Sequence, residues 1–250
     1  MRRTSLLSSS IAATLLVSLL AACGGGDDAT PAKFSAATDL QRQRAIGAAA
    51  GTDAALAFFV GAFSVQAPPE ATCPTVTHQG STATAVFDCD SGGQRIDGRI
   101  VAENVGNPFS DSGPASDPTR AVVLTFDGYR QHADTAAEEL ALDGTLTLRP
   151  DQAMVIALEV SLGGVAVDTD ATLTSDGTLS RAADGSSIEV DGLGRATIGG
   201  AWSLDTDAPA GVLELHGADL LRARFADAAS GCVPLTIDGA PAGQLCDNDP

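Results

Sequence analysis

The sequence has 250 residues, and its 14 lysines and arginines against 32 aspartates and glutamates give a net charge of −18 at pH 7. Phosphate groups repel a chain this acidic, so nucleic acid is excluded as a partner. The apolar fraction of 44% is sufficient for a packed core and excludes a chain that is disordered throughout.

The first 22 residues have the organisation of a signal peptide. Arg2 and Arg3 form a basic start, and the apolar stretch at 6–20, interrupted by serines and threonines, is too short for a comfortable membrane span. The stretch ends in Leu20-Ala21-Ala22-Cys23, which resembles the lipobox of bacterial lipoproteins. The resemblance covers residues 1–23 only.

This resemblance implies that a lipoprotein signal peptidase cuts before Cys23, that the cysteine sulfur carries a diacylglycerol thioether and that the new terminal amine is acylated. A cysteine with three acyl chains carries more chains than stable anchoring needs. The next residue is Gly24, whereas an aspartate there retains lipoproteins in the inner membrane of enteric bacteria. We therefore expect a lipid-anchored protein of the bacterial cell envelope, in the outer membrane. The alternative is an ordinary secretory signal in which Cys23 is incidental.

Residues 23–36 are predicted to form a flexible tether, because the chain up to Lys33 is mostly Gly, Asp, Ala, Thr and Pro. A helical segment follows at 37–67. It opens with Thr38-Asp39-Leu40-Gln41, which has the form of a capping box, and restarts after Gly51-Thr52-Asp53.

The second part of this helical segment has one strongly apolar face. Leu56, Phe59, Val60 and Phe63 fall at i, i+3, i+4 and i+7, and Phe58 adjoins them. The helix is predicted to stop before the two prolines at 68–69.

Five cysteines divide into Cys23, which the lipid takes, and four others in an exported chain. An even number in an oxidising compartment indicates two disulfides. Of the three possible connectivities we favour Cys73 with Cys89 and Cys232 with Cys246, because each pair encloses a short segment that resembles a hairpin. A zinc site is disfavoured, because CxxC spacing and nearby histidines are missing.

From Cys73 onward the hydrophobic period changes to two, which indicates strands that are polar on one face. Two segments alternate most clearly, and their apolar faces hold Leu140, Leu142, Leu146 and Leu148, and Met154, Ile156, Leu158, Val160 and Leu162. Further strands are predicted at 82–88, 94–102, 120–128, 165–174, 186–191, 194–204, 211–216 and 219–226.

Short turns such as Gly163-Gly164 and Ser175-Asp176-Gly177 separate the predicted strands, so neighbours in sequence should pair. Asp-Gly pairs inside strands, as at Asp143-Gly144, indicate bulges or bends. We therefore predict a mainly β fold over residues 68–250: an antiparallel up-and-down meander that forms a curved sheet, half-barrel or sandwich, with one or two N-terminal helices. The long stretch at 106–118 is a possible boundary within it.

The apolar face of such a sheet must be covered. The sheet closes on itself, or a second sheet packs on it, or the helix at 52–66 lies in its concavity.

Reaction chemistry is not apparent in the sequence. No G-x-S-x-G motif occurs, and His78, His132 and His216 stand apart from one another, so we interpret them as surface or structural residues. Trp202 lies on an apolar strand face and is predicted to pack in the core.

Asp-x-Asp pairs at 88–90, 168–170, 205–207 and 247–249 carry the oxygen ligands that calcium prefers. None of them completes an EF-hand loop, and aspartate is common at turns for local reasons. We therefore predict no metal site and no cofactor, with calcium binding as the alternative.

Taken together, the sequence predicts a non-catalytic lipoprotein that serves as a binding or structural component, with the membrane, a hydrophobic ligand or an envelope protein as partner. One alternative is a lipid carrier whose concave face is lined by Leu142, Leu146, Ile156 and Leu158, by analogy with periplasmic carriers that have half-barrel sheets and covering helices. The same pattern fits a sealed core. A second alternative is an envelope hydrolase, which needs a cleft where a histidine meets a carboxylate.

Overall fold

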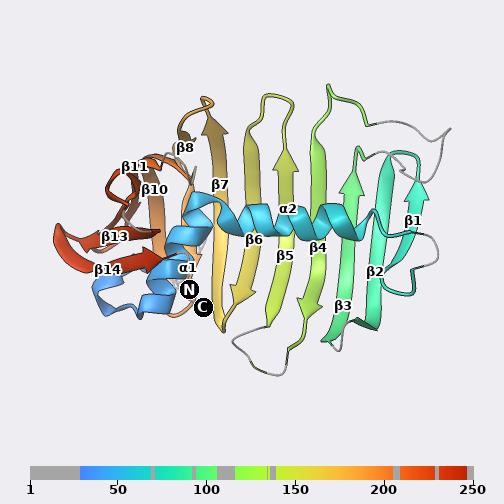
Figure 1. Ribbon diagram of the computed structural model, residues 1–250, viewed down its shortest axis with the longest axis horizontal. Coiled ribbons are helices and arrows are strands. Elements are labelled where there is room, and N and C mark those ends of the chain that lie inside the picture. The colour runs from blue at the N-terminus through green and yellow to red at the C-terminus, as the bar shows by residue number, and fades with distance from the viewer. Residues whose placement is uncertain are drawn as a thin grey trace, which may run out of the picture.

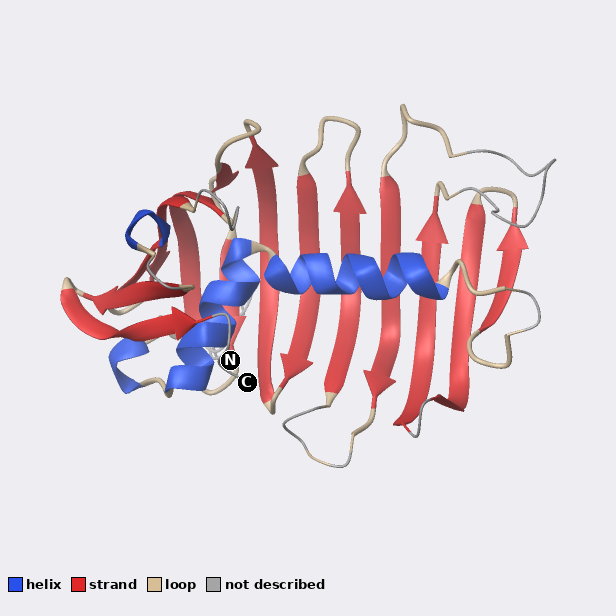
Figure 2. Ribbon diagram, viewed as in Figure 1, coloured by secondary structure: helices blue, strands red, loops and turns tan. Residues whose placement is uncertain are grey.

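The computed structural model describes residues 29–68, 71–91, 94–105, 116–133, 135, 139–204, 209–228 and 231–246. These residues form one large antiparallel sheet with two α-helices packed on one of its faces (Figures 1 and 2). The predicted lipidation site, Cys23, lies outside the described residues, as do the aspartate pairs at 205–207 and 247–249.

The sheet has fourteen strands within the described chain. They are β1 (Thr75–Gln79), β2 (Thr82–Ser91), β3 (Gln94–Glu103), β4 (Val122–Gln131), β5 (Leu140–Leu148), β6 (Met154–Leu162), β7 (Val165–Ser175), β8 (Ser180–Ala182), β9 (Ser187–Val190), β10 (Gly194–Ser203), β11 (Ala210–His216), β12 (Leu220–Arg224), β13 (Cys232–Ile237) and β14 (Ala240–Cys246).

Successive strands are neighbours in the sheet, except that β8 and β9 both lie between β7 and β10. The predicted antiparallel meander is therefore confirmed. Strands β1 and β14 stand at the two ends of the order, so the sheet is open. Strands β3 and β4 pair directly on either side of the possible boundary at 106–118, so the sheet continues across it.

Two of the Asp-Gly pairs produce the predicted bulges, because the register shifts at Gly98 between β3 and β4 and at Gly128 between β4 and β5. At Gly144 the pairing of β5 with β6 is continuous. Its φ of 115° and the carbonyl oxygen of Ala157, which would lie 2.3 Å from an added Cβ, still require glycine.

Helix α1 (Asp39–Ala50) and helix α2 (Thr52–Ser64) meet at Gly51, which has a left-handed φ of 90°. The predicted capping box is present: the Thr38 hydroxyl accepts a hydrogen bond from the Gln41 backbone N–H, and the Gln41 side chain accepts one from the Thr38 N–H. Short 3-10 helices lie at Phe34–Ala36 and Phe225–Asp227.

The described part of the predicted tether is packed on the body. Pro31 forms a parallel bridge with Arg195 of β10, and Ala32 and Phe34 are fully buried. The Asp219 carboxylate accepts backbone hydrogen bonds from Phe34 and Ser35 at 2.6 and 2.8 Å. The structure thus shortens the segment available as a tether, because these apolar side chains belong to the core.

The helices cover the apolar face of the sheet from one end towards the other. Helix α1 contacts β7, β9 and β11, and α2 crosses β6, β5, β4 and β3 (Figure 1). Trp202 of β10 is completely buried, as predicted, and its indole N–H donates to the Ala50 carbonyl at the end of α1 over 3.4 Å.

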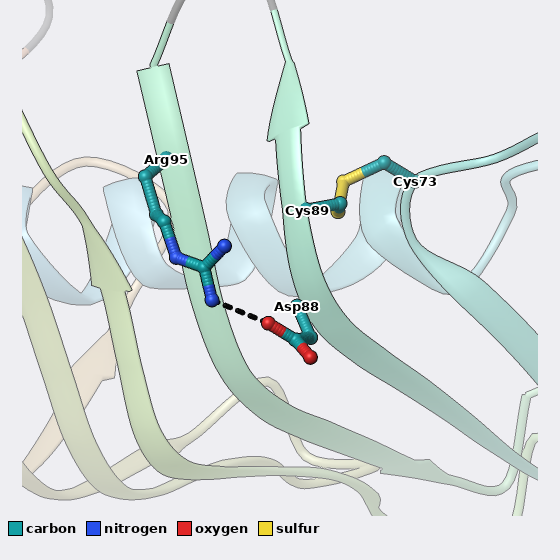
Figure 3. The surroundings of a disulfide bond; sticks show 4 residues. All are labelled: Cys73, Asp88, Cys89 and Arg95. Carbon is teal, nitrogen blue, oxygen red and sulfur yellow. Dashed lines mark hydrogen bonds and ion pairs between the residues drawn. A yellow bond between two sulfur atoms is a disulfide. The ribbon is translucent and has the colours of Figure 1, made fainter.

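Both predicted disulfides are present, Cys73–Cys89 and Cys232–Cys246. The first joins the segment before β1 to β2, and beside it an ion pair between Asp88 and Arg95 links β2 to β3 (Figure 3). The second joins β13 to β14, where the two cysteines are opposite each other in register. The disulfides therefore fasten the first and last hairpins of the sheet.

Candidate binding surface on helix α2

Helix α2 approaches the sheet with small side chains. Ala54, Ala57 and Gly61 are buried at its contact with the strands. A Cβ added to Gly61 would lie 2.8 Å from Leu124 Cδ1 of β4. The helix backbone therefore lies close against the leucine and phenylalanine side chains that fill the inner face of the sheet.

The apolar face predicted for this helix points away from the sheet. Phe59 and Phe63 are 58% and 71% exposed, and their rings stack with centroids 6.2 Å apart and planes inclined by 15°. Leu56, Phe58 and Val60 are half-buried at the flanks of the helix, where they pack against the core. Of the three expected ways to cover the sheet, the structure shows the helix. Phe59 and Phe63 do not face the sheet, because only a narrow stripe of small side chains allows so close an approach.

Charge is absent from the outward side of α2. Asp53 is the only ionisable residue of the helix, and its side chain is 7% exposed. Both of its oxygens accept hydrogen bonds from Arg44 of α1, each at 2.8 Å. Burial raises the pKa of Asp53, and the Arg44 guanidinium opposes this rise. The pair joins α1 to α2 and leaves the outward face uncharged.

We define the outward face of α2 as the side that exposes Phe59 and Phe63, with the half-buried Leu56 and Val60 at its edges. Exposed aromatic pairs on an uncharged helix are typical of interaction surfaces. Among the described residues no single helix is long and apolar enough to cross a membrane; α1 and α2 meet that test of length and composition only as a pair, with a bend of 67° between them.

The four residues expected to line a lipid pocket are sealed. Leu142, Leu146, Ile156 and Leu158 each expose 1% of their surface. Water therefore scarcely reaches these four side chains. Other side chains fill the space beside them. In this arrangement the inner face of the sheet is a core under the helices.

Two of the three histidines meet carboxylates at the surface. His132 Nε2 lies 2.7 Å from Asp97 Oδ2, with Glu139 3.8 Å from the other ring nitrogen. His216 Nε2 lies 3.3 Å from Glu214. These histidine–carboxylate contacts lie at the surface, and all of their side chains are partly exposed.

The opposite, outer face of the sheet carries a row of acids that sequence reasoning did not find. Asp143, Glu159, Asp168 and Glu189 are opposite one another in register on four neighbouring strands, β5, β6, β7 and β9. Arg195 of β10 ends the row with an ion pair to Glu189 at 3.1 Å. We call these four residues the acidic row.

A hollow of about 420 Å³ lies along this row and is lined by Glu159, Ala166, Asp168, Glu189 and Asp191. Partial burial raises the pKa of Asp168, and the charges of Glu189 and Asp170 raise it further, while Arg195 opposes them. In the described part of the chain no three histidine, cysteine or carboxylate side chains are arranged to hold a metal ion.

Replacing Asp168 with asparagine is expected to stabilise the protein by about 0.5–1 kcal/mol at low ionic strength, because it removes two like-charge cross-strand contacts. The raised pKa means that wild type loses stability as the pH rises through it, so the gain from the variant should grow from acid to neutral pH. Added salt should shrink the gain.

Urea denaturation at acid and neutral pH, with and without salt, measures this effect. The control is Glu103→Gln, since the cross-strand partner of Glu103 is Val123. If the free energy of unfolding of Asp168→Asn at neutral pH is no larger than that of Glu103→Gln, repulsion within the acidic row does not destabilise the protein.

No known protein family, curated protein or solved structure matches the chain. The candidate surface therefore rests on its own geometry.

Proposed function

We propose that the protein is a bacterial envelope lipoprotein, anchored in the outer membrane by acyl chains on Cys23, and that its body is a non-catalytic binding component. Its binding surface is the outward face of α2. The observation that carries this proposal is the stacked, exposed pair Phe59 and Phe63 on a helix whose outward side has no charge.

The energetics of α2 support a binding role. A phenylalanine side chain contributes about 1.5–3 kcal/mol when it moves from water into an apolar environment. The two exposed rings do not make most of that gain in the isolated body, whereas the small residues Ala54, Ala57 and Gly61 on the opposite side of the helix are buried. A partner that covers the rings would recover it.

Lipid carriage on the inner face of the sheet is less well supported than a surface role. Leu142 and Ile156, expected to line such a pocket, are sealed under the helices. A lipid would enter only if α2 left the sheet and broke the Arg44–Asp53 pair. A hydrolase is also less well supported, because His132 and His216 contact carboxylates on the partly exposed surface.

When an ordinary cleaved secretory signal replaces residues 1–22 and Cys23 is changed to alanine, the protein is expected to leave the membrane, because neither acyl chains nor an uncut signal then supplies an anchor. In the native host, wild type should sediment with membranes, resist extraction by high salt and dissolve in detergent. The Cys23→Ala variant should lose this behaviour. Ser18→Ala, which leaves the lipobox residues intact, is the control and should fractionate as wild type does.

Equal membrane association of wild type and Cys23→Ala would contradict the lipid anchor. A soluble wild-type protein would contradict it as well.

A further inference from the structure

The part of the chain that the structure describes begins a few residues after the predicted anchor. The Thr30 carbonyl accepts a hydrogen bond from the Arg195 backbone N–H at 2.9 Å, and the Ala32 N–H donates to the Arg195 carbonyl at 2.8 Å, so this strand-like start is fixed on β10. The chain from Cys23 to Thr30 spans at most about 25 Å even when fully extended. If Cys23 is acylated, the body cannot move farther than this from the bilayer.

The first described elements lead onto the helical side of the sheet. The 3-10 helix at Phe34–Ala36 leads into α1, and α1 and α2 pack on the same face (Figure 1). The short tether therefore keeps α2 close to the bilayer, so the effective concentration of lipid at α2 is high. At such a concentration even a weak contact between α2 and the lipid becomes favourable.

Helix α2 and the outer face of the sheet differ in charge. The outward face of α2 is uncharged, whereas the outer face of the sheet carries the acidic row Asp143, Glu159, Asp168 and Glu189. Anionic lipid head groups repel the acidic face and leave the helical face free to approach. A second copy of this chain is a poorer occupant, because two copies of so acidic a chain repel each other.

We infer that the outward face of α2 lies on the bilayer that holds Cys23, with the Phe59 and Phe63 rings inserted among the lipid acyl chains. This inference rests on the proposed function, since only the lipid anchor brings the bilayer within reach. Helices of this kind bury their apolar face about 5–10 Å into the boundary between head groups and acyl chains. The fourteen-stranded sheet then faces away from the membrane and presents the acidic row to the surroundings.

The test uses the mature lipoprotein reconstituted into phosphatidylcholine vesicles that carry brominated acyl chains, which quench tryptophan fluorescence on contact. The single native tryptophan, Trp202, is completely buried and serves as the reference. A Phe63→Trp variant places an indole on the outward face of α2. The matched control is Val86→Trp, because Val86 is 47% exposed and lies on the opposite face of the sheet, between the buried Ala85 and Phe87.

The expected result is loss of most of the emission of the indole introduced at Phe63, with little loss for wild type or for Val86→Trp. Adding Phe59→Asp to the Phe63→Trp variant should restore much of the emission, because a charge beside the ring opposes insertion. Flotation of the same samples with the vesicles reports the anchor separately.

Protein that floats with the vesicles but shows equal quenching at the two introduced positions overturns the inference and leaves the anchor standing. Protein that does not float overturns both the anchor and the inference. An indole that is shielded in a dimer of the body, seen by sedimentation without vesicles, overturns the inference in favour of a second copy.

Discussion

Replacing Arg44 with alanine is expected to destabilise the body by about 3–5 kcal/mol, because it leaves the Asp53 carboxylate buried without its partner. The side chains of the pair are 11% and 7% exposed, so water cannot take the place of the guanidinium. Burial raises the pKa of Asp53, and without Arg44 nothing opposes that rise. The carboxyl should therefore take up a proton on acidification, and the loss of stability should be largest at neutral pH and smaller at acid pH.

Urea denaturation of the unanchored body, followed by Trp202 fluorescence, measures this loss. The control is Arg149→Ala, since the Arg149–Asp151 pair is about half exposed on both sides and should contribute about 0–1 kcal/mol. Replacing both partners by apolar residues, Arg44→Met with Asp53→Leu, should recover most of the stability. An Arg44→Ala variant as stable as Arg149→Ala would contradict the account of the junction between α1 and α2.

Replacing Trp202 with alanine is expected to cost about 3–5 kcal/mol, because it leaves a large cavity in the core. The side chain is completely buried on β10, and its N–H donates to the Ala50 carbonyl where α1 ends. Removal of the indole ring and its hydrogen bond should therefore loosen the attachment of α1 to the sheet. Thermal unfolding followed by circular dichroism measures it without relying on tryptophan fluorescence.

Trp202→Phe is the graded control. It keeps a six-membered aromatic ring and loses the N–H donor with the rest of the pyrrole ring, so it should cost clearly less than alanine. Equal losses for the two variants would mean that the hydrogen bond to Ala50, and not the filled volume, holds α1 in place.

Much of the sheet could be predicted because alternation is a local property. The leucines at 140, 142 and 146 are buried on one face of β5, as their period of two indicates. Because the turns between these strands are short, strands that are consecutive in sequence pair in an antiparallel way. The two disulfides followed from the same reasoning, because each joins cysteines close in sequence at the ends of a hairpin.

Two short strands, β8 and β14, are absent from the predicted set of strands. Strand β8 has three residues, and β14 contains proline and glycine among its seven, so neither has a clear period. Their places are set by pairing with longer neighbours, which a local pattern does not contain.

The direction of α2 depends on what it packs against. Its sequence has an apolar stripe through Phe59 and Phe63 and a small-residue stripe through Ala54, Ala57 and Gly61, and either could face a sheet. The inner face of the sheet is already filled by large side chains such as Leu124 and the helix must come close, so the small stripe packs there. The spacing of these small residues was the signal that could have revealed it.

The acidic row is likewise a product of register. Alternation places Asp143, Glu159, Asp168 and Glu189 on the polar face of their strands, but only the pairing of four strands brings them into one line. A shift by two residues in any of these pairs would break the row without moving an acid off the face.

The lipid on Cys23 is the central claim, since both the proposed function and the position of α2 on the bilayer depend on it. The most direct test is the mass of the intact protein, and of its N-terminal peptide, purified from the membranes of the native host. We predict a chain that starts at Cys23, lacks residues 1–22 and carries the added mass of a diacylglycerol thioether and an acylated amine. A chain cut at another position, or one that starts at Cys23 with an unmodified sulfur, would contradict the account.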